Sequence, residues 1–278
     1  LHHNLDKGLI IAGKAQPEFQ GGKIISPIKI IIAGRATSQI GNIKLPVSEI
    51  IKDAIRRYLK PYNLIYEIST EIGETSTSLI ETDSNKANDT SFGVAHFPLT
   101  HLETLTKKIS HYINSDRFRK KYKTGLDTKV LGLRERTSFN FTIAIAFICK
   151  HIKNIREYAL LKKQIKKELE NEFSVKVKIN TMDGSSLKTS YLTVTGFSGE
   201  NGDDRQVGRT KRYNGIISAN SPMSLEAISG KNIYHPGKLY QIMSHIIARD
   251  LVKVCNLEKV NVKIVSEIGS SLKKPQLV

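Results

Sequence analysis

The sequence predicts an α/β fold built from three similar strand–helix–strand units. Apolar runs of strand length recur along the chain, a segment with a helical apolar stripe follows each of them, and a second strand pattern follows each helix. A chain of 278 residues with 39% hydrophobic residues is also long enough to bury a core in more than one unit. We expect the units to span residues 1–86, 87–185 and 186–278.

In the first unit, an apolar strand over residues 28–33 precedes a helix that Pro46 opens, and a strand over 63–70 follows. The apolar stripe of this helix includes Ile50 and Tyr58. The second unit repeats the order with a strand over 139–148, a helix over about 151–172 and a strand over 175–180. The third has strands over 191–195 and 261–266 around a helix over about 237–255, whose apolar face includes Leu251 and Val254. An extra helix over about 99–114 separates the first two units.

The charge balance indicates an anionic partner. The chain has 43 Lys and Arg against 26 Asp and Glu, a net charge of +17. Such an excess suits nucleic acid, an anionic membrane surface or a phosphorylated small molecule. No apolar run approaches the roughly 20 residues that a membrane-spanning helix needs. The start of the chain carries no secretory signal, so we expect a cytoplasmic location, and both cysteines, Cys149 and Cys255, are expected as reduced core thiols.

A basic run with interleaved aromatic residues spans residues 117–123. Lysine and arginine bind phosphates and aromatic rings stack on bases, so such a run can bind RNA. A solvated connector has the same composition. The sequence alone leaves both interpretations open.

Two polar segments lie between the strands and helices. Residues 202–212 place two carboxylates close to several cations and two glycines, as a metal–triphosphate site requires, although a polar turn with local ion pairs would look the same. Residues 229–238 place glycine and lysine directly before the third helix, where a helix N-terminus favours anions. Residues 72–78 and 87–93 are weaker candidates of the same kind.

Short motifs, in order along the whole chain, together resemble the archaeal-type S-adenosylmethionine synthetases. They are Leu1-His2-His3-Asn4-Leu5-Asp6-Lys7-Gly8-Leu9, Gly21-Gly22, Pro27-Ile28, Ala33-Gly34-Arg35-Ala36-Thr37, Ala87-Asn88-Asp89-Thr90-Ser91-Phe92-Gly93-Val94, Gly132-Leu133-Arg134, Leu192-Thr193-Val194-Thr195-Gly196, Gly202-Asp203-Asp204, Gln206-Val207-Gly208-Arg209, Pro222-Met223-Ser224 and Gly230-Lys231-Asn232.

The resemblance implies that methionine sulfur attacks C5′ of ATP and that the released tripolyphosphate is hydrolysed to phosphate and pyrophosphate. It implies three related subdomains in a pseudo-threefold arrangement and a homodimer with active sites at its interface. ATP, L-methionine and S-adenosylmethionine are the expected ligands, with Mg²⁺ and also K⁺ as ions. Cations at the substrate phosphates would then account for the charge, so neither a nucleic-acid nor a membrane partner is expected.

Site residues follow from the same resemblance, position by position. Arg209 and Lys231 look like phosphate cations, Asp203 like the carboxylate for the methionine amino group or the metal, and Asp204 like a metal ligand. The expected substrate- and ATP-binding residues are Lys7, Gly73, Glu74, Thr75, Ser76, Asp89 and His235.

The chain also departs from the family pattern. The departures are Thr75, Ser138, Arg205, Thr210, Lys211 and Ile233. The family's Gly-His-Pro-Asp segment, with its catalytic histidine, and its C-terminal stretch have no counterpart in the sequence, so we expect an interior piece of a longer protein. A basic, RNA-binding relative that kept the fold without catalysis is the alternative interpretation.

Overall fold

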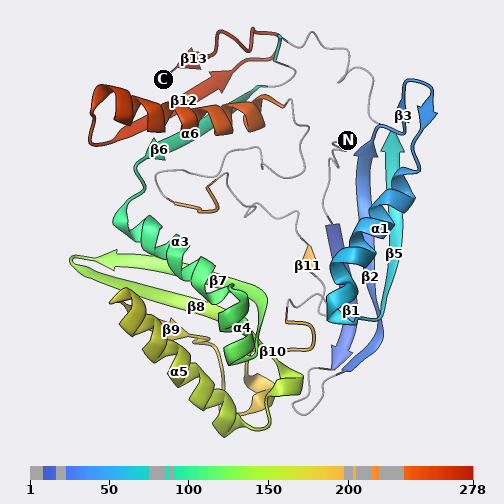
Figure 1. Ribbon diagram of the computed structural model, residues 1–278, viewed down its shortest axis with the longest axis vertical. Helices are drawn as coiled ribbons and strands as arrows, with labels where there is room; N and C mark the ends of the chain where they lie inside the picture. Colours follow the sequence, from blue (N-terminus) through green and yellow to red (C-terminus); the bar gives the residue numbers. More distant parts are fainter. Residues whose placement is uncertain are drawn as a thin grey trace.

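The computed structural model describes residues 9–16, 23–74, 85–87, 90–196, 203–204, 214–218 and 235–277. These residues form three sheets of three or four strands and a small hairpin of β3 (Gln39–Ile40) and β4 (Ile43–Lys44). Figure 1 shows helices lying along each of the three larger sheets. The mixture of helices and strands confirms the predicted α/β class. None of the helices in the described ranges is long and apolar enough to cross a membrane.

The first sheet has the strand order β11-β1-β2-β5. Its strands are β1 (Leu9–Gln16), β2 (Lys23–Ala36), β5 (Tyr66–Glu74) and β11 (Asp203–Asp204). Parallel strands β2 and β5 are connected through α1 (Val47–Leu59) and the short helix η1 (Lys60–Tyr62). Alternate residues Ile28, Ile30 and Ile32 of β2 pack with Leu59 in the core, which confirms the strand–helix–strand order predicted for this part of the chain. Tyr58 and Ile50, expected on the apolar stripe, are exposed, so only part of that stripe packs on the sheet.

The second sheet is built around β8 (Ser138–Ile148). This strand pairs antiparallel with β7 (Thr124–Glu135) and parallel with both β9 (Lys176–Ile179) and β10 (Leu192–Thr193). Helix α5 (Ile155–Phe173) connects β8 to β9, as the second predicted unit requires. The expected extra helix is α3 (His101–Ile113). One face of the sheet and these helices enclose the largest core cluster of the described residues.

The basic run at residues 117–123 belongs to a helix, α4 (Asp116–Tyr122), rather than to a connector. Its aromatic residues Phe118 and Tyr122 are 3% exposed and pack in the core. Ser115 caps the helix, because its hydroxyl accepts a hydrogen bond from the Phe118 N–H at 3.3 Å. Aromatic rings buried in this way cannot stack on bases, so the proposed stacking role is wrong.

The third sheet has the order β13-β12-β6 and lies beside α6 (Pro236–Cys255). Its strands are β6 (Ser91–Phe97), β12 (Val260–Ser266) and β13 (Gln276–Leu277). The expected third unit is therefore wrong in one strand: β10 pairs with β8, whereas β12 pairs antiparallel with β6. Strand β6 approaches α6 closely, since a Cβ added at Gly93 would lie 2.2 Å from the Tyr240 backbone carbon. Such an approach explains why glycine occupies this position.

The expected apolar face of α6 is also only partly buried. Tyr240 and Ala248 pack in the core, whereas Leu251 and Val254 are exposed. Of the two cysteines, Cys149 is buried as predicted, but Cys255 is exposed at the end of this helix.

The division at residues 1–86, 87–185 and 186–278 stays a prediction. The sheets combine strands from different expected units: β6 pairs with β12, and β11 pairs with β1. The first and third sheets are therefore assembled from segments distant in sequence, whereas the strands of the second all lie within residues 124–193.

Candidate functional site

A cavity of about 250 Å³ lies at the carboxyl ends of the parallel strands β2 and β5. It is lined by Ala36 at the end of β2, by Ser38 just after that strand, by the start of α1, and by residues 72–74 at the end of β5. Ligands of α/β folds characteristically bind outside the carboxyl ends of parallel strands. This cavity contains two residues predicted from sequence, Gly73 and Glu74.

Polar groups converge on this cavity. The Ser38 N–H donates to Oε2 of Glu74 at 3.3 Å, which fastens the end of β5 to the segment after β2. Helix α1 begins at Val47, which lines the cavity, so the free N–H groups of its first turn lie at the end of the helix that faces the cavity. A volume of 250 Å³ is below the roughly 300–1,000 Å³ of pockets for drug-sized ligands, so the cavity suits one part of a nucleotide rather than all of it. Sequence reasoning missed Ser38, although a polar residue directly after a buried parallel strand is a usable signal.

Gly73 pairs with Arg35 across the β2–β5 ladder. A Cβ added at Gly73 would have Gly34 O as its nearest neighbour at 3.9 Å, an ordinary contact distance. The fold itself therefore does not require glycine at this position, in contrast to Gly93.

Asp203 and Asp204 form a short strand at the edge of the first sheet, and the rest of the segment 202–212 lies outside the described residues, so the polar-turn interpretation stays open. Strand β11 pairs antiparallel with β1, with Asp203 opposite Ile11 and Asp204 opposite Ile10. Strands β11 and β5 are the two outer strands of this sheet, three strand spacings or about 14 Å apart. The structure does not bring the two aspartates next to Glu74 within one chain.

His235 has a structural role that the sequence reasoning missed. It is the N-cap of α6, is buried, and accepts a hydrogen bond at Nδ1 from the Gly237 N–H at 3.1 Å. The accepting nitrogen carries no proton, so a neutral ring has its proton on Nε2. The expected ATP-binding role of His235 stays a prediction.

The remaining predicted positions lie outside the described residues. They are Lys7, Thr75, Ser76, Asp89, Arg209 and Lys231, together with the departures Arg205, Thr210, Lys211 and Ile233. Ser138 is described and lies opposite Glu135 at the start of β8. Within the described ranges, no group of three His, Cys, Asp or Glu side chains could hold a metal ion.

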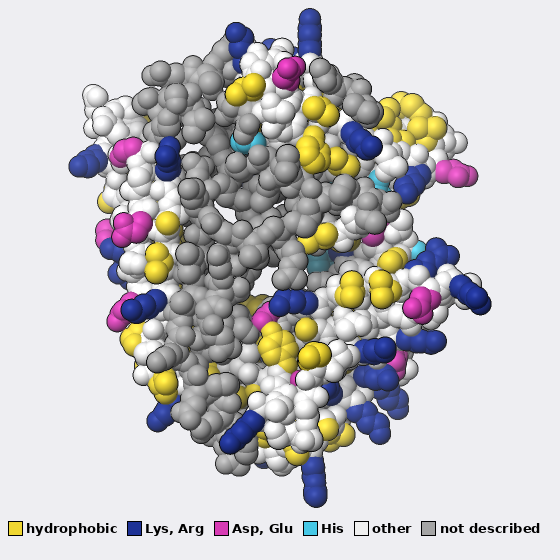
Figure 2. Space-filling view, turned by 180° about the vertical axis from the view of Figure 1, so that it is seen from behind, with side chains coloured by type: hydrophobic (Ala, Val, Ile, Leu, Met, Phe, Trp, Pro, Cys, Tyr) yellow, Lys and Arg dark blue, Asp and Glu magenta, His cyan; other side chains and the backbone are white. Residues whose placement is uncertain are grey.

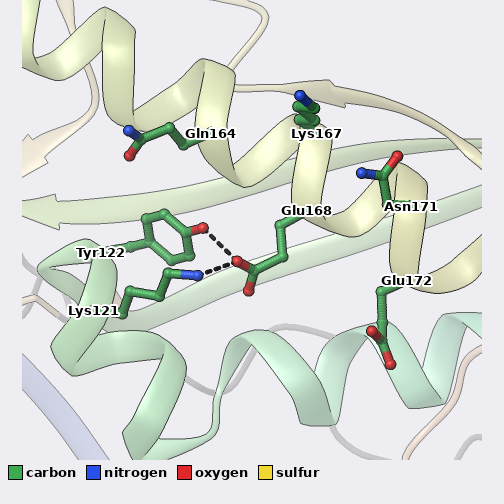
Figure 3. Close-up of a pocket in the computed structure, with 7 residues that line it drawn as sticks. All are labelled: Lys121, Tyr122, Gln164, Lys167, Glu168, Asn171 and Glu172. Atoms are coloured by element: carbon green, nitrogen blue, oxygen red, sulfur yellow. Dashed lines mark hydrogen bonds and ion pairs between the residues drawn. The ribbon is translucent and has the colours of Figure 1, made fainter.

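A second, larger groove of about 590 Å³ lies between α4 and α5, and no predicted site residue lines it (Figure 3). Glu168 on its floor accepts hydrogen bonds from Tyr122 at 2.6 Å and Tyr112 at 2.9 Å, and pairs with Lys121. Burial raises the pKa of Glu168, but Lys121 and the two tyrosines outweigh burial and hold that pKa below its ordinary value. Glu168 is therefore a charged, fully engaged carboxylate that joins α5 to α3 and α4.

Comparisons with known proteins agree on one family. The family model of S-adenosylmethionine synthetase (AdoMet synthetase) matches residues 1–278. The chain is 40% identical over 295 residues to the S-adenosylmethionine synthase of Picrophilus torridus, covering 100% of this chain and 73% of that protein. It is also 40% identical over 296 residues to that of Archaeoglobus fulgidus, covering 99% and 74%.

A solved structure has a similar fold. A structure described as an unusual S-adenosylmethionine synthetase from Campylobacter jejuni matches with a TM-score of 0.60 and 17% identity, covering 99% of this chain and 71% of that one. Such low identity supports the fold alone. The family model and the close relatives both extend over practically all of this chain, and the chain therefore belongs to the S-adenosylmethionine synthetase family.

Proposed function

We propose that this chain catalyses the formation of S-adenosylmethionine, phosphate and pyrophosphate from ATP, L-methionine and water. The observation that carries the proposal is the family match over residues 1–278. The polar cavity at the ends of β2 and β5 supports it, since it offers a preformed place for part of the nucleotide.

In the first step, a lone pair of the methionine sulfur forms the bond to C5′. The electrons of the C5′–O bond leave with tripolyphosphate, and water then cleaves this product into phosphate and pyrophosphate. Negative charge grows on the leaving oxygen, so positioned cations lower the barrier. We assign that role to Arg209 and Lys231.

We place the nucleoside end of ATP in the cavity at the ends of β2 and β5. Gly73 has no side chain to cover the strand surface beside the cavity. The carboxylate of Glu74 lines the cavity and is held in place by the hydrogen bond from the Ser38 N–H. Thr75 and Ser76, which follow Glu74 in the sequence, are assigned to ATP as well, and Lys7 and Asp89 to the methionine end.

Mg²⁺ fits the donor chemistry of Asp203 and Asp204, because carboxylate oxygens are the hard ligands that this ion prefers. When bound, Mg²⁺ would neutralise charge on the phosphates. Following the family resemblance, we assign Asp204 to the metal and Asp203 to the methionine amino group. We assign no residue to K⁺.

We further propose that two subunits share the site. The aspartates and Glu74 lie on opposite edges of one sheet, so a second subunit is the simplest way to bring such groups together. Leu131 and Leu133 of β7 support this, since they are 56% and 52% exposed on the sheet face away from α3. We expect a dimer that buries more than about 2,000 Å², as obligate interfaces do. A cytoplasmic location is part of the same proposal.

The direct test is incubation of the protein with ATP, methionine and Mg²⁺, followed by mass spectrometry of the products. We expect S-adenosylmethionine together with equal amounts of phosphate and pyrophosphate. Nucleotide hydrolysis without methionine dependence would contradict the assignment.

A further inference from the structure

Much of the positive charge of the chain lies in a stretch of the sequence that contains neither Arg209 nor Lys231. Residues 101–179, which contain α3 to β9, hold 19 Lys and Arg against eight Asp and Glu. Figure 2 shows Lys and Arg side chains gathered at the lower right, on the side where α5 lies. Substrate phosphates bound near Arg209 and Lys231 leave this excess unexplained.

The packing of α4 and α5 directs their cations outward. In α4, burial of Phe118 and Tyr122 leaves Arg117, Lys120 and Lys121 exposed. In α5, the buried stripe of Tyr158, Ile165 and Leu169 leaves further cations exposed. These are Arg156, Lys163, Lys166 and Lys167. We call the exposed cations of the two helices, with the groove between them, the α4–α5 surface.

The groove adds neutral hydrogen-bonding groups to this surface. Gln164 and Asn171 of α5 line it beside Lys121 and Lys167 (Figure 3). The charge of Glu168 is already balanced by Lys121 and two tyrosine hydroxyls. Among the described residues, Lys120, Lys163 and Lys167 have no acidic side chain within ion-pair distance, so these cations are available to a ligand.

The composition of the α4–α5 surface favours one class of ligand. A protein interface needs an apolar or aromatic centre, but Leu160 is the one strongly exposed large hydrophobic residue in the described α4 and α5. Insertion into a membrane needs a free apolar face, whereas Ile165 and Leu169 are fully buried. Single-stranded nucleic acid is held by stacking on aromatic rings, and those of α4 lie in the core. Phosphates of a double helix need none of these features.

Helix α5 has 19 residues and is about 28 Å long, enough to follow several successive phosphates. The amides of Gln164 and Asn171 both donate and accept hydrogen bonds, as a ribose 2′-hydroxyl does. We propose that the α4–α5 surface binds the backbone of double-stranded RNA, as a second function separate from adenosyl transfer. This proposal runs against the expectation, drawn from the family resemblance, that no nucleic acid is a partner.

Fluorescence anisotropy with a labelled RNA duplex of about 20 base pairs tests the proposal, with a DNA duplex of the same sequence as comparison. The variant combines Lys120→Gln, Lys163→Gln and Lys167→Gln. A matched control combines Lys60→Gln, Lys253→Gln and Lys259→Gln, exposed lysines of other elements with the same loss of charge. Glutamine keeps nearly the helix propensity of lysine, and circular dichroism checks both folds.

We expect the α4–α5 variant to bind the RNA duplex roughly 10- to 100-fold more weakly, with a salt slope smaller by about 2 to 3, since each lost phosphate contact removes about 0.7–0.9. The control should change less than about threefold, and both variants should keep full S-adenosylmethionine synthesis. The proposal would be overturned if both variants lost RNA affinity equally, or if the unmodified protein bound the DNA duplex as tightly as the RNA duplex. It would also be overturned if polyglutamate displaced the RNA, or if the unmodified protein did not bind RNA.

Discussion

Nε2 of His96 lies 2.8 Å from Oε2 of Glu103, and the two side chains are only 1% and 6% exposed. The Thr100 N–H and hydroxyl each donate to the same carboxylate oxygen at 2.8 Å. Because His96 belongs to β6 and Glu103 to the first turn of α3, this contact joins the third sheet to the helices of the second. A buried carboxylate with several donors therefore holds two parts of the molecule together.

The first prediction concerns pH. Burial raises the pKa of Glu103, but the Ser218 hydroxyl, His96 and Thr100 outweigh burial and lower it from 4.5 to about 2. A pKa that is lower in the folded state stabilises the protein above pH 4.5, and this stabilisation is lost as the pH falls toward 2. Denaturant unfolding at pH 5 and at pH 3 measures it, and Glu103→Gln should reduce the difference between the two.

At pH 7, we expect Glu103→Gln to lower the free energy of unfolding by about 2–3 kcal/mol. Glu172→Gln, on the exposed surface of α5, is the control and should change it by less than about 0.5 kcal/mol. If both variants lowered the free energy of unfolding by similar amounts, the buried contacts of Glu103 would not stabilise the fold in this way.

The second prediction compares two glycines. A Cβ at Gly93 would collide with the Tyr240 backbone, whereas at Gly73 it finds room. Gly93→Ala should therefore cost about 3 kcal/mol of stability or more, because backbone atoms cannot yield as a flexible side chain does. Gly73→Ala should cost less than about 1 kcal/mol and should instead raise the KM for ATP. Thermal unfolding and steady-state kinetics separate the two outcomes, and a stable Gly93→Ala protein would show that β6 and α6 do not pack this closely.

The third prediction concerns assembly. Leu131→Glu places a charge on the exposed face of the second sheet, and burying that charge in a dimer would be costly. We expect light scattering at micromolar concentration to report dimers for the unmodified protein and monomers for this variant. Leu160→Glu is the matched control, since Leu160 is 55% exposed on α5, and it should remain dimeric. An unmodified protein that is monomeric would exclude a shared site.

The fourth prediction separates the two aspartates of β11. If only one of them binds the metal, Asp203→Asn and Asp204→Asn should have different effects. The variant that loses the metal ligand should need an Mg²⁺ concentration about tenfold higher or more for half-maximal activity. The other variant should change the KM for methionine. Activity measured across Mg²⁺ and methionine concentrations distinguishes them. Identical shifts in both variants would indicate that the pair acts as one metal site.

Local periodicity predicted the parts of the fold whose strands are joined by one helix. The runs before and after α1 and α5 pair in parallel, as expected of strand–helix–strand units. The third unit failed because β12 pairs with β6, more than 160 residues earlier, and local patterns carry no information on distant partners. Strand β6 was also hidden, since it begins in a polar segment and contains Gly93.

The site was predicted in a different way. Motif resemblance identified the family and supplied Gly73 and Glu74, which in the structure lie at the carboxyl ends of parallel strands, where ligands of α/β folds bind. A two-residue strand such as Asp203–Asp204 has no sequence pattern, so its pairing with β1 was not predictable. The capping role of His235 was missed because histidine is not among the usual N-cap residues, although Pro236 marks the first position of the helix.

The central claim, adenosyl transfer assisted by cations at the leaving tripolyphosphate, is tested most directly by Arg209→Ala. Methionine-dependent formation of S-adenosylmethionine is measured for this variant, for the unmodified protein and for Arg57→Ala, an exposed arginine of α1 that serves as control. We predict a rate roughly 10²- to 10³-fold lower for Arg209→Ala, with an unchanged circular dichroism spectrum and normal activity of the control. Activity of Arg209→Ala within twofold of the unmodified protein, or no product from the unmodified protein, would contradict the account.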